Sequence, residues 1–298
     1  MKFIPAKQLV ADAQKRKYAI PALNSNGGSY DITRAALETA QELRAPLILQ
    51  VYEPNCKYRG FNYFVNQANF LCDELKITVP VALQVDHGKS LDSALNAMRA
   101  GFTSFMFDAS HCPLEENIAK TKEVVHEAAK FGVSIEAEVG YVKGNEPSQQ
   151  KLIGRIEVPI EPTIPPAKTT VDEALRFVDE VDVDMLAVSI GTTHGVYQRQ
   201  CKIDFDLLAA LAEAIPVPLV MHGTCGISID DISRLSRVGM AKVNFGEPFR
   251  FNYIKYFNKL TDEMEHLWHP WKIMQEVKNQ IKNDMQDLIK ALGAAGRA

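Results

Sequence analysis

The sequence contains little cysteine, and no two cysteines form a C-x-x-C pair. The five cysteines among the 298 residues are scattered along the chain as Cys56, Cys72, Cys112, Cys201 and Cys225. An odd number at irregular spacing does not fit a disulfide framework. We therefore expect free thiols in the reducing environment of the cytoplasm.

Long apolar runs and clusters of basic residues are also missing. No segment is long and apolar enough to span a bilayer, and the start of the chain lacks the apolar core of a signal peptide. The formal net charge of -4, without any run of Lys and Arg, argues against nucleic-acid binding. We expect a small-molecule substrate, and neither a membrane nor a nucleic acid as partner.

Short strand-type runs alternate with longer amphipathic stretches. The predicted strands are residues 18–23, 46–51, 81–85, 104–107, 134–139, 185–189, 219–221 and 242–244. The predicted helices between them include residues 32–43, 91–100, 114–131, 171–181, 205–214 and 229–238. This alternation predicts a parallel sheet, and eight units close most simply into a (β/α)8 TIM barrel. The alternative, an open doubly wound sheet, needs a G-x-G-x-x-G loop, which Asn24-Ser-Asn-Gly-Gly is not.

Two segments depart from this repeat within what we expect to be a single domain, residues 1–298. Residues 143–168 are rich in Pro, Gly, Gln and Glu, which predicts a mobile active-site loop. Residues 250–298 extend past the last strand and are predicted to form a C-terminal helical extension. We expect this extension to pack on the barrel or on another subunit.

Three histidines each follow a different predicted strand and each precede a glycine. They are His87, His194 and His222. A lone histidine is usually structural, but three in this context would converge at the carboxyl ends of the strands, where barrel enzymes place their active sites. Three protein ligands with an open fourth position are typical of catalytic zinc. The sequence therefore predicts an open zinc site.

Carboxylates occur at the same strand ends. Asp86 adjoins His87 and would act either as a general base or as a carboxylate that orients a histidine. Asp108 and Glu138 end adjacent strands. They would provide a second or resting metal position, or would form a hydrogen-bonded pair lining the barrel mouth.

These segments resemble the class II, zinc-dependent ketose-bisphosphate aldolases, which include the fructose-bisphosphate and tagatose-bisphosphate aldolases. The resemblance runs from the first strand to the last residues. It rests on Val85-Asp-His-Gly88, Phe107-Asp-Ala-Ser-His-Cys-Pro-Leu-Glu-Glu-Asn117, Glu136-Ala-Glu-Val-Gly140, Ala187-Val-Ser-Ile-Gly-Thr-Thr-His-Gly195, Met221-His-Gly223, Lys242-Val-Asn244 and the terminal Leu-Gly-Ala-Ala-Gly-Arg-Ala.

The resemblance implies an aldolase that reversibly cleaves the C3–C4 bond of a ketose phosphate or an analogue. The products would be dihydroxyacetone phosphate, or dihydroxyacetone, and an aldehyde. It implies that His87, His194 and His222 bind one zinc ion per subunit. Asp86 would be the acid/base on the C4 hydroxyl, and Glu146 would be the loop acid that moves the proton at C3.

Further roles follow from the same resemblance. Asn244 would contact the donor ketone fragment, and Asn24 matches the pocket asparagine after the first strand. Gly195 and Gly223 match backbone that holds a monovalent cation, Na⁺ or K⁺, and the donor phosphate. The resemblance and the helical tail together predict a homodimer or a homotetramer.

The donor-phosphate site departs from the family pattern. The family commonly has His-Gly-Gly-Ser-Gly after the seventh strand and Asn-x-x-Thr after the eighth, whereas this chain has Cys225 and Glu247 in place of the serine and the threonine. An ionised carboxylate some 4 Å from a phosphate would cost about 4 kcal/mol per charge pair. Two interpretations follow. Either the donor is not held as a phosphate ester and Glu247 accepts its hydroxyl protons, or Glu247 turns outward to pair with Arg250 and phosphate still binds.

Two milder departures concern the third and second strands. Gln84 stands where the family usually has the first histidine of His-Leu-Asp-His, which is not a zinc ligand. A serine often found after the second strand is missing, and Lys57 and Arg59 follow instead. Lys57 and Arg59 are each either a cation that binds a distal phosphate or sulfonate of the substrate, or part of a solvated loop.

Three other functions remain open from the sequence. A metal-dependent epimerase or isomerase would isomerise the ketose without releasing an aldehyde. A zinc hydrolase would use a metal-bound water, which the lack of a second histidine-rich cluster disfavours. A non-catalytic sugar-phosphate binder is disfavoured because His87, His194, His222, Asp86 and Glu146 are all retained.

Overall fold

Eight parallel strands close into a barrel in the computed structural model, which describes residues 3–140, 142, 167–195, 202–263 and 269–298. Each strand pairs with the next along the chain, and β8 pairs with β1 to complete the ring. The strands are β1 (Ile20–Asn24), β2 (Leu47–Tyr52), β3 (Val81–Gly88), β4 (Ser104–Phe107), β5 (Ser134–Val139), β6 (Met185–Val188), β7 (Leu219–Met221) and β8 (Met240–Phe245). The predicted barrel is confirmed, and the predicted strand positions agree to within a few residues.

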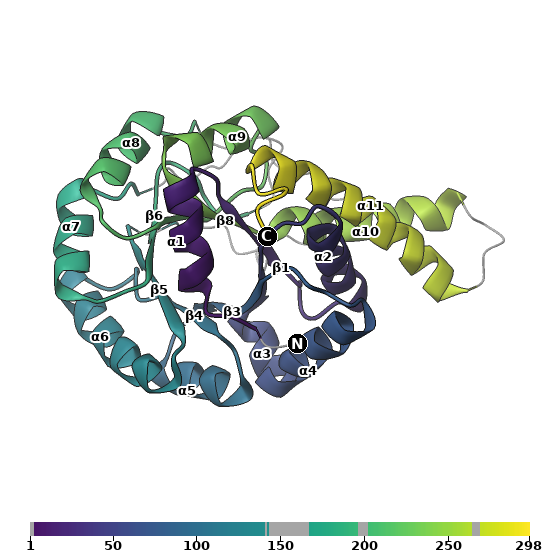
Figure 1. Ribbon diagram of the computed structural model, residues 1–298, viewed down its shortest axis with the longest axis horizontal. Coiled ribbons are helices and arrows are strands. Elements are labelled where there is room, and N and C mark those ends of the chain that lie inside the picture. The colour runs from purple at the N-terminus through teal and green to yellow at the C-terminus, as the bar shows by residue number, and fades with distance from the viewer. Residues whose placement is uncertain (1–2, 141, 143–166, 196–201, 264–268) are drawn as a thin grey trace.

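Helices surround the barrel as an outer ring (Figure 1). They include α2 (Tyr30–Glu42), α4 (Phe61–Glu74), α5 (Leu91–Ala100), α6 (Leu114–Phe131), α7 (Val171–Glu180), α8 (Phe205–Ala214) and α9 (Ile229–Val238). Side-chain oxygens fix where several of them begin. Ser90 accepts a hydrogen bond from the backbone N–H of Ser93, and Thr170 forms a reciprocal capping box with Glu173. Because helices cover the outer face of the sheet, both faces of the strands are buried.

Helix α1 (Ala6–Arg16) lies across the end of the barrel at which the strands begin (Figure 1). The backbone N–H of Ile4 donates to the carbonyl of Val81 at 3.0 Å, and the N–H of Lys7 donates to Oγ of Ser134 at 3.1 Å. Both partners open their strands. The amino end of the barrel is therefore covered, and the carboxyl end is left for a site.

A short helix, α3 (Glu53–Arg59), follows β2 directly and was not expected from the sequence. Its first residue, Glu53, is buried and bonds to Nζ of Lys57 at 2.9 Å and to the backbone N–H of Lys89 at 3.3 Å. These contacts fix α3 against the carboxyl end of β3.

The C-terminal extension consists of α10 (Glu247–Glu263) and α11 (Pro270–Ala291). It begins three residues before the predicted start at residue 250. The two helices form a hairpin whose outer end projects beyond the barrel (Figure 1). Helix α11 buries a stripe that packs beside α2, formed by Ile273, Val277, Ile281, Met285 and Ile289. Within the described residues, no helix is both long enough and apolar enough to cross a membrane.

Candidate active site

The end of β3 brings two adjacent residues into one pocket. Neighbours on a regular strand point to opposite faces, but His87 has a left-handed backbone with φ of +52°, and the pairing with β4 shifts register between Val85 and Gly88. Asp86 and His87 consequently both line the cavity. A left-handed conformation costs an ordinary residue roughly 1–2 kcal/mol. A Cβ atom at position 88 would lie 2.0 Å from the ring of Phe105, so this turn also requires glycine.

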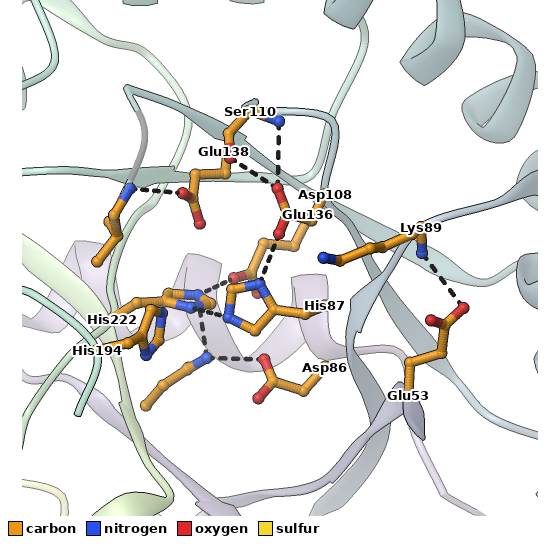
Figure 2. Close-up of polar contacts among 12 residues, drawn as sticks. Glu53, Asp86, His87, Lys89, Asp108, Ser110, Glu136, Glu138, His194 and His222 are labelled. Atoms are coloured by element: carbon orange, nitrogen blue, oxygen red, sulfur yellow. Dashed lines mark hydrogen bonds and ion pairs between the residues drawn. The ribbon is translucent and has the colours of Figure 1, made fainter. Parts of the chain in front are cut away.

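The three predicted histidines converge at the carboxyl ends of β3, β6 and β7 (Figure 2). The ring centroid of His87 lies 5.0 Å from that of His194 and 4.8 Å from that of His222. Nε2 of His87 is 3.0 Å from Nδ1 of His222. One nitrogen from each ring can be chosen so that all three lie within 4.8 Å of one another.

Each of these rings also has a nitrogen beside a carboxylate. The pairs are His87 with Asp108 at 2.9 Å, His194 with Glu247 at 3.1 Å and His222 with Glu136 at 2.8 Å. A carboxylate on one nitrogen fixes the tautomer and the orientation of a ring whose other nitrogen binds a metal. The arrangement therefore leaves one nitrogen of each histidine for a shared ion.

The donor set fits zinc. Two nitrogens bound tetrahedrally at 2.0–2.1 Å from one ion are about 3.3 Å apart, close to the 3.0 Å between His87 and His222. His87 also forms a second group with Asp108 and Glu138, which could hold an ion in another position. Oε2 of Glu138 is buried without a hydrogen-bond partner among the described residues. Burial, and then the nearby Asp108, raise the pKa of Glu138 to about 7.

Asp86 is held between two amides. Nδ2 of Asn24 donates to Oδ2 of Asp86 at 3.2 Å, and Nδ2 of Asn244 donates to Oδ1 at 3.3 Å. The carboxylate is 8% exposed, and it lines a cavity of about 400 Å³ together with the three histidines. This volume suits a small molecule.

A buried ion pair that the sequence reasoning missed lies beneath the histidines. Nζ of Lys242 is 2.6 Å from Oε2 of Glu136 and 2.7 Å from Oδ1 of Asn244, and Gln84 also donates to Glu136 at 2.8 Å. Burial opposes ionisation of Glu136, but Lys242 and His222 outweigh it and lower its pKa to about 2. Period-two spacing in the sequence could have revealed this pair. Glu136 and Glu138 share one face of β5, and Lys242 and Asn244 share one face of β8.

Glu247 turns into the pocket. It lines the cavity and contacts Nδ1 of His194, with its side chain 18% exposed. The interpretation in which it turns outward is therefore wrong. Burial opposes its ionisation, but the hydrogen bond with His194 lowers the pKa of Glu247 to about 2.

The expected distal cations lie elsewhere. Lys57 pairs with Glu53, and the guanidinium of Arg59 stands 5.3 Å from the ring centroid of Tyr63; neither lines the cavity. Within the described part of the chain, the cavity is instead lined by the cations Lys89 and Arg250. The change from Lys57 and Arg59 follows from α3, which was not expected and which turns both side chains toward solvent.

The remaining predicted residues divide into three groups. Asn24, Gly195, Gly223 and Asn244 line the cavity, whereas Cys225 is buried and does not. A Cβ atom on Gly223 would lie 2.6 Å from the carbonyl oxygen of Thr193, so the close approach of the two loops requires glycine. Glu146 and nearly all of the predicted loop at 143–168 lie outside the described residues.

Comparison with known proteins agrees with this geometry. Residues 4–297 match the family described as fructose-bisphosphate aldolase class-II. The chain is 37% identical to a 6-phospho-5-dehydro-2-deoxy-D-gluconate aldolase of Shouchella clausii, over 100% of this chain and 97% of the relative. It is 34% identical to a fructose-bisphosphate aldolase of Staphylococcus aureus, over 100% of both chains.

A solved structure is similar over nearly its whole length. The crystal structure of the YdjI aldolase from Escherichia coli K12 aligns with a TM-score of 0.82 and 28% identity, over 99% of each chain. This similarity covers the barrel and the C-terminal helices together. The chain thus belongs to the class-II fructose-bisphosphate aldolase family and is an aldolase, a lyase.

Proposed function

We propose that this aldolase is zinc-dependent and reversibly cleaves the C3–C4 bond of a ketose phosphate or a close analogue. The products would be dihydroxyacetone phosphate, or dihydroxyacetone, and an aldehyde. The observation that carries the proposal is the convergence of three histidines, each aligned by its own carboxylate, beside Asp86. His87, His194 and His222 would hold the ion.

A bound zinc ion would supply Lewis acidity, which stabilises the negative charge that develops on the ketone fragment as the bond breaks. The residues of the chain would do the rest. Asp86, held by Asn24 and Asn244, would take the proton of the C4 hydroxyl during cleavage and return it during synthesis. Asn244 would also contact the donor fragment, and Glu146 would move the proton at C3.

The names of the relatives support the substrate class. Both 6-phospho-5-dehydro-2-deoxy-D-gluconate and fructose bisphosphate are phosphorylated keto compounds derived from sugars. A cavity of about 400 Å³ lined by amides, carboxylates and histidines suits a polyol of this size.

Three further proposals accompany the reaction. A monovalent cation, Na⁺ or K⁺, would bind near the backbone of Gly195 and Gly223, which both line the cavity. The enzyme would act in the cytoplasm on a small sugar. It would be a homodimer or a homotetramer, in keeping with a helical hairpin that projects beyond the barrel.

The test is a panel of ketoses and ketose phosphates given to purified, zinc-loaded protein, with aldehyde release as the readout. We expect chelation to abolish release and zinc to restore it. We expect Asp86→Asn to lower kcat/KM by roughly 10²–10⁴-fold while the zinc content stays unchanged. Undiminished turnover after chelation, or in the Asp86→Asn variant, would contradict the proposal.

A further inference from the structure

The donor side of the cavity is formed where β8 passes into α10. Asn244 lies near the end of β8, Gly246 follows, and α10 begins at Glu247. All three residues line the cavity, as does Arg250 one turn further along the helix. Under the proposed function this corner receives the end of the ketone fragment that is not cleaved.

The start of α10 would ordinarily favour an anion. Unpaired backbone N–H groups and the helix dipole make a helix N-terminus a natural place for a phosphate. Here Glu247 is itself the first residue of the helix, and its side-chain carboxylate bonds to its own backbone N–H as well as to His194. The carboxylate of Glu247 therefore occupies the N-terminus of α10, where a bound phosphate would be most stabilised.

Two neighbouring side chains, those of Thr224 and Cys225, do not offset that charge with a free hydroxyl donor. The hydroxyl of Thr224 donates to the carbonyl of Asn244 at 2.7 Å, so its proton is already used. Cys225 stands where the family commonly has a serine, and its thiol is buried away from the cavity. A thiol is also a much weaker hydrogen-bond donor than a hydroxyl.

Arg250 is the only cation of this corner within the described residues, and Glu247 opposes it. Arg250 is exposed, and it lines the cavity one turn after Glu247 on α10. The charges of Glu247 and Arg250 therefore sum to zero, so this turn of α10 offers a dianion no net charge attraction.

We propose that Glu247 makes the donor side of the cavity select an uncharged hydroxymethyl ketone, of the dihydroxyacetone type, over its phosphate ester. This inference rests on the proposed function for the identity of the reacting ends. A carboxylate can accept several hydrogen bonds, so Glu247 can contact His194 and still accept a proton from a donor hydroxyl. It repels a phosphate at the same place, and discrimination by repulsion is a common source of specificity.

The decisive comparison uses dihydroxyacetone and dihydroxyacetone phosphate with the zinc-loaded protein. Dissociation constants of both are measured by calorimetry, and both are tested as donors in synthesis with one fixed aldehyde. The variants are Glu247→Gln, which keeps an oxygen beside His194 but removes the charge, and Glu263→Gln. The latter makes the same change at the far end of α10, about 24 Å away along the helix.

We expect the wild-type protein and Glu263→Gln to prefer dihydroxyacetone in both measurements. We expect Glu247→Gln to shift the ratio of the two affinities toward the phosphate ester by roughly tenfold or more. With zinc kept in excess, the zinc content of every sample should remain one ion per chain in all three proteins. In Arg250→Gln, the affinity for the phosphate ester should fall below that of the wild-type protein.

Two results would overturn the inference. One is a wild-type preference for the phosphate ester, and the other is a ratio of affinities that Glu247→Gln leaves unchanged or that Glu263→Gln shifts equally. Failure of the proposed function looks different: neither donor is turned over by any zinc-loaded variant. The two dissociation constants still decide the inference in that case, because they do not depend on turnover.

Discussion

At the scale of single residues, the site is organised by pairs. Each of the three histidines has a carboxylate on one nitrogen, and those carboxylates come from three different places: after β4, within β5 and at the start of α10. Each ring is therefore oriented by a carboxylate of its own, while the rings of His87 and His222 also contact each other at 3.0 Å. Loss of one carboxylate should loosen chiefly the ring that it orients.

Asp108→Asn tests this arrangement. The amide can still contact His87 but no longer enforces the tautomer, so we expect zinc affinity to fall by roughly 10–100-fold without loss of fold. Competition with a chromophoric chelator measures the affinity, and circular dichroism checks the fold. Glu180→Gln, at an exposed position at the end of α7, is the matched control and should bind zinc like the wild type. Equal affinities in Asp108→Asn and wild type would refute the role of Asp108.

Zinc binding should strengthen as the pH rises. Burial favours the neutral form of His87, but Asp86 and Asp108 outweigh it and raise its pKa to about 10 in the metal-free protein. Burial lowers the pKa of His222, which favours its neutral form. Since a histidine binds a metal only in its neutral form, His87 must lose its proton on binding below pH 10, and this loss makes the affinity rise roughly tenfold per pH unit.

The measurement is zinc affinity between pH 6 and 8, together with calorimetry in buffers of different ionisation enthalpy. The second experiment counts released protons directly. An affinity that is flat over this range, with no proton released, would show that His87 is neutral before the metal arrives.

At the scale of elements, the strands were predictable because buried parallel strands are largely apolar runs, such as residues 185–188. Helices α3 and α4 were not predicted. The first contains Pro54 and Asn55, and the second is rich in asparagine and aromatic residues, so neither has the composition of a strong helix former. Their helical form depends on packing against the barrel, which local sequence does not record.

The same limit explains which site residues were found. The histidines and Asp86 stand directly beside glycine-marked strand ends, a pattern visible along the chain. Glu136 and Lys242 meet only when β5 and β8 face each other across the barrel. Lys89 and Arg250 reach the cavity through the placement of loops and α10, so only the three-dimensional structure assigns them.

The turn at the end of β3 can be tested through Gly88. A methyl group there would meet the ring of Phe105 at 2.0 Å, so we expect Gly88→Ala to reduce the free energy of unfolding by about 1–3 kcal/mol. Urea denaturation measures the change. Gly246→Ala is the matched control, since its methyl group would make an ordinary contact at 3.5 Å with Asn24. If the two variants are equally stable, the close packing of Gly88 on Phe105 is not limiting.

At the scale of the whole molecule, the α10–α11 hairpin extends beyond the barrel and leaves large apolar side chains in solvent. Ile254 is 51% exposed on α10 and Trp271 is 61% exposed on α11. Large exposed apolar groups on a projecting element are typical of subunit contacts. The expected homodimer or homotetramer would use this surface.

Replacing both Ile254 and Trp271 by Glu should weaken the assembly because it introduces charge into an apolar contact. Light scattering coupled to size exclusion would then show a shift toward smaller species at micromolar concentration. Phe70→Glu, at a position 59% exposed on α4, serves as the control and should leave the mass unchanged. A wild-type protein that is monomeric at all concentrations would remove the basis of this prediction.

Backbone pairing between strands holds the barrel together around its full ring. The histidine-aligning carboxylates belong to this scaffold. Removal of the metal should thus leave a folded protein that can bind a metal ion again, rather than an unfolded chain. Occupancy by zinc or by a rival such as cobalt would then follow the supply of metals around the enzyme as much as the protein's own preference.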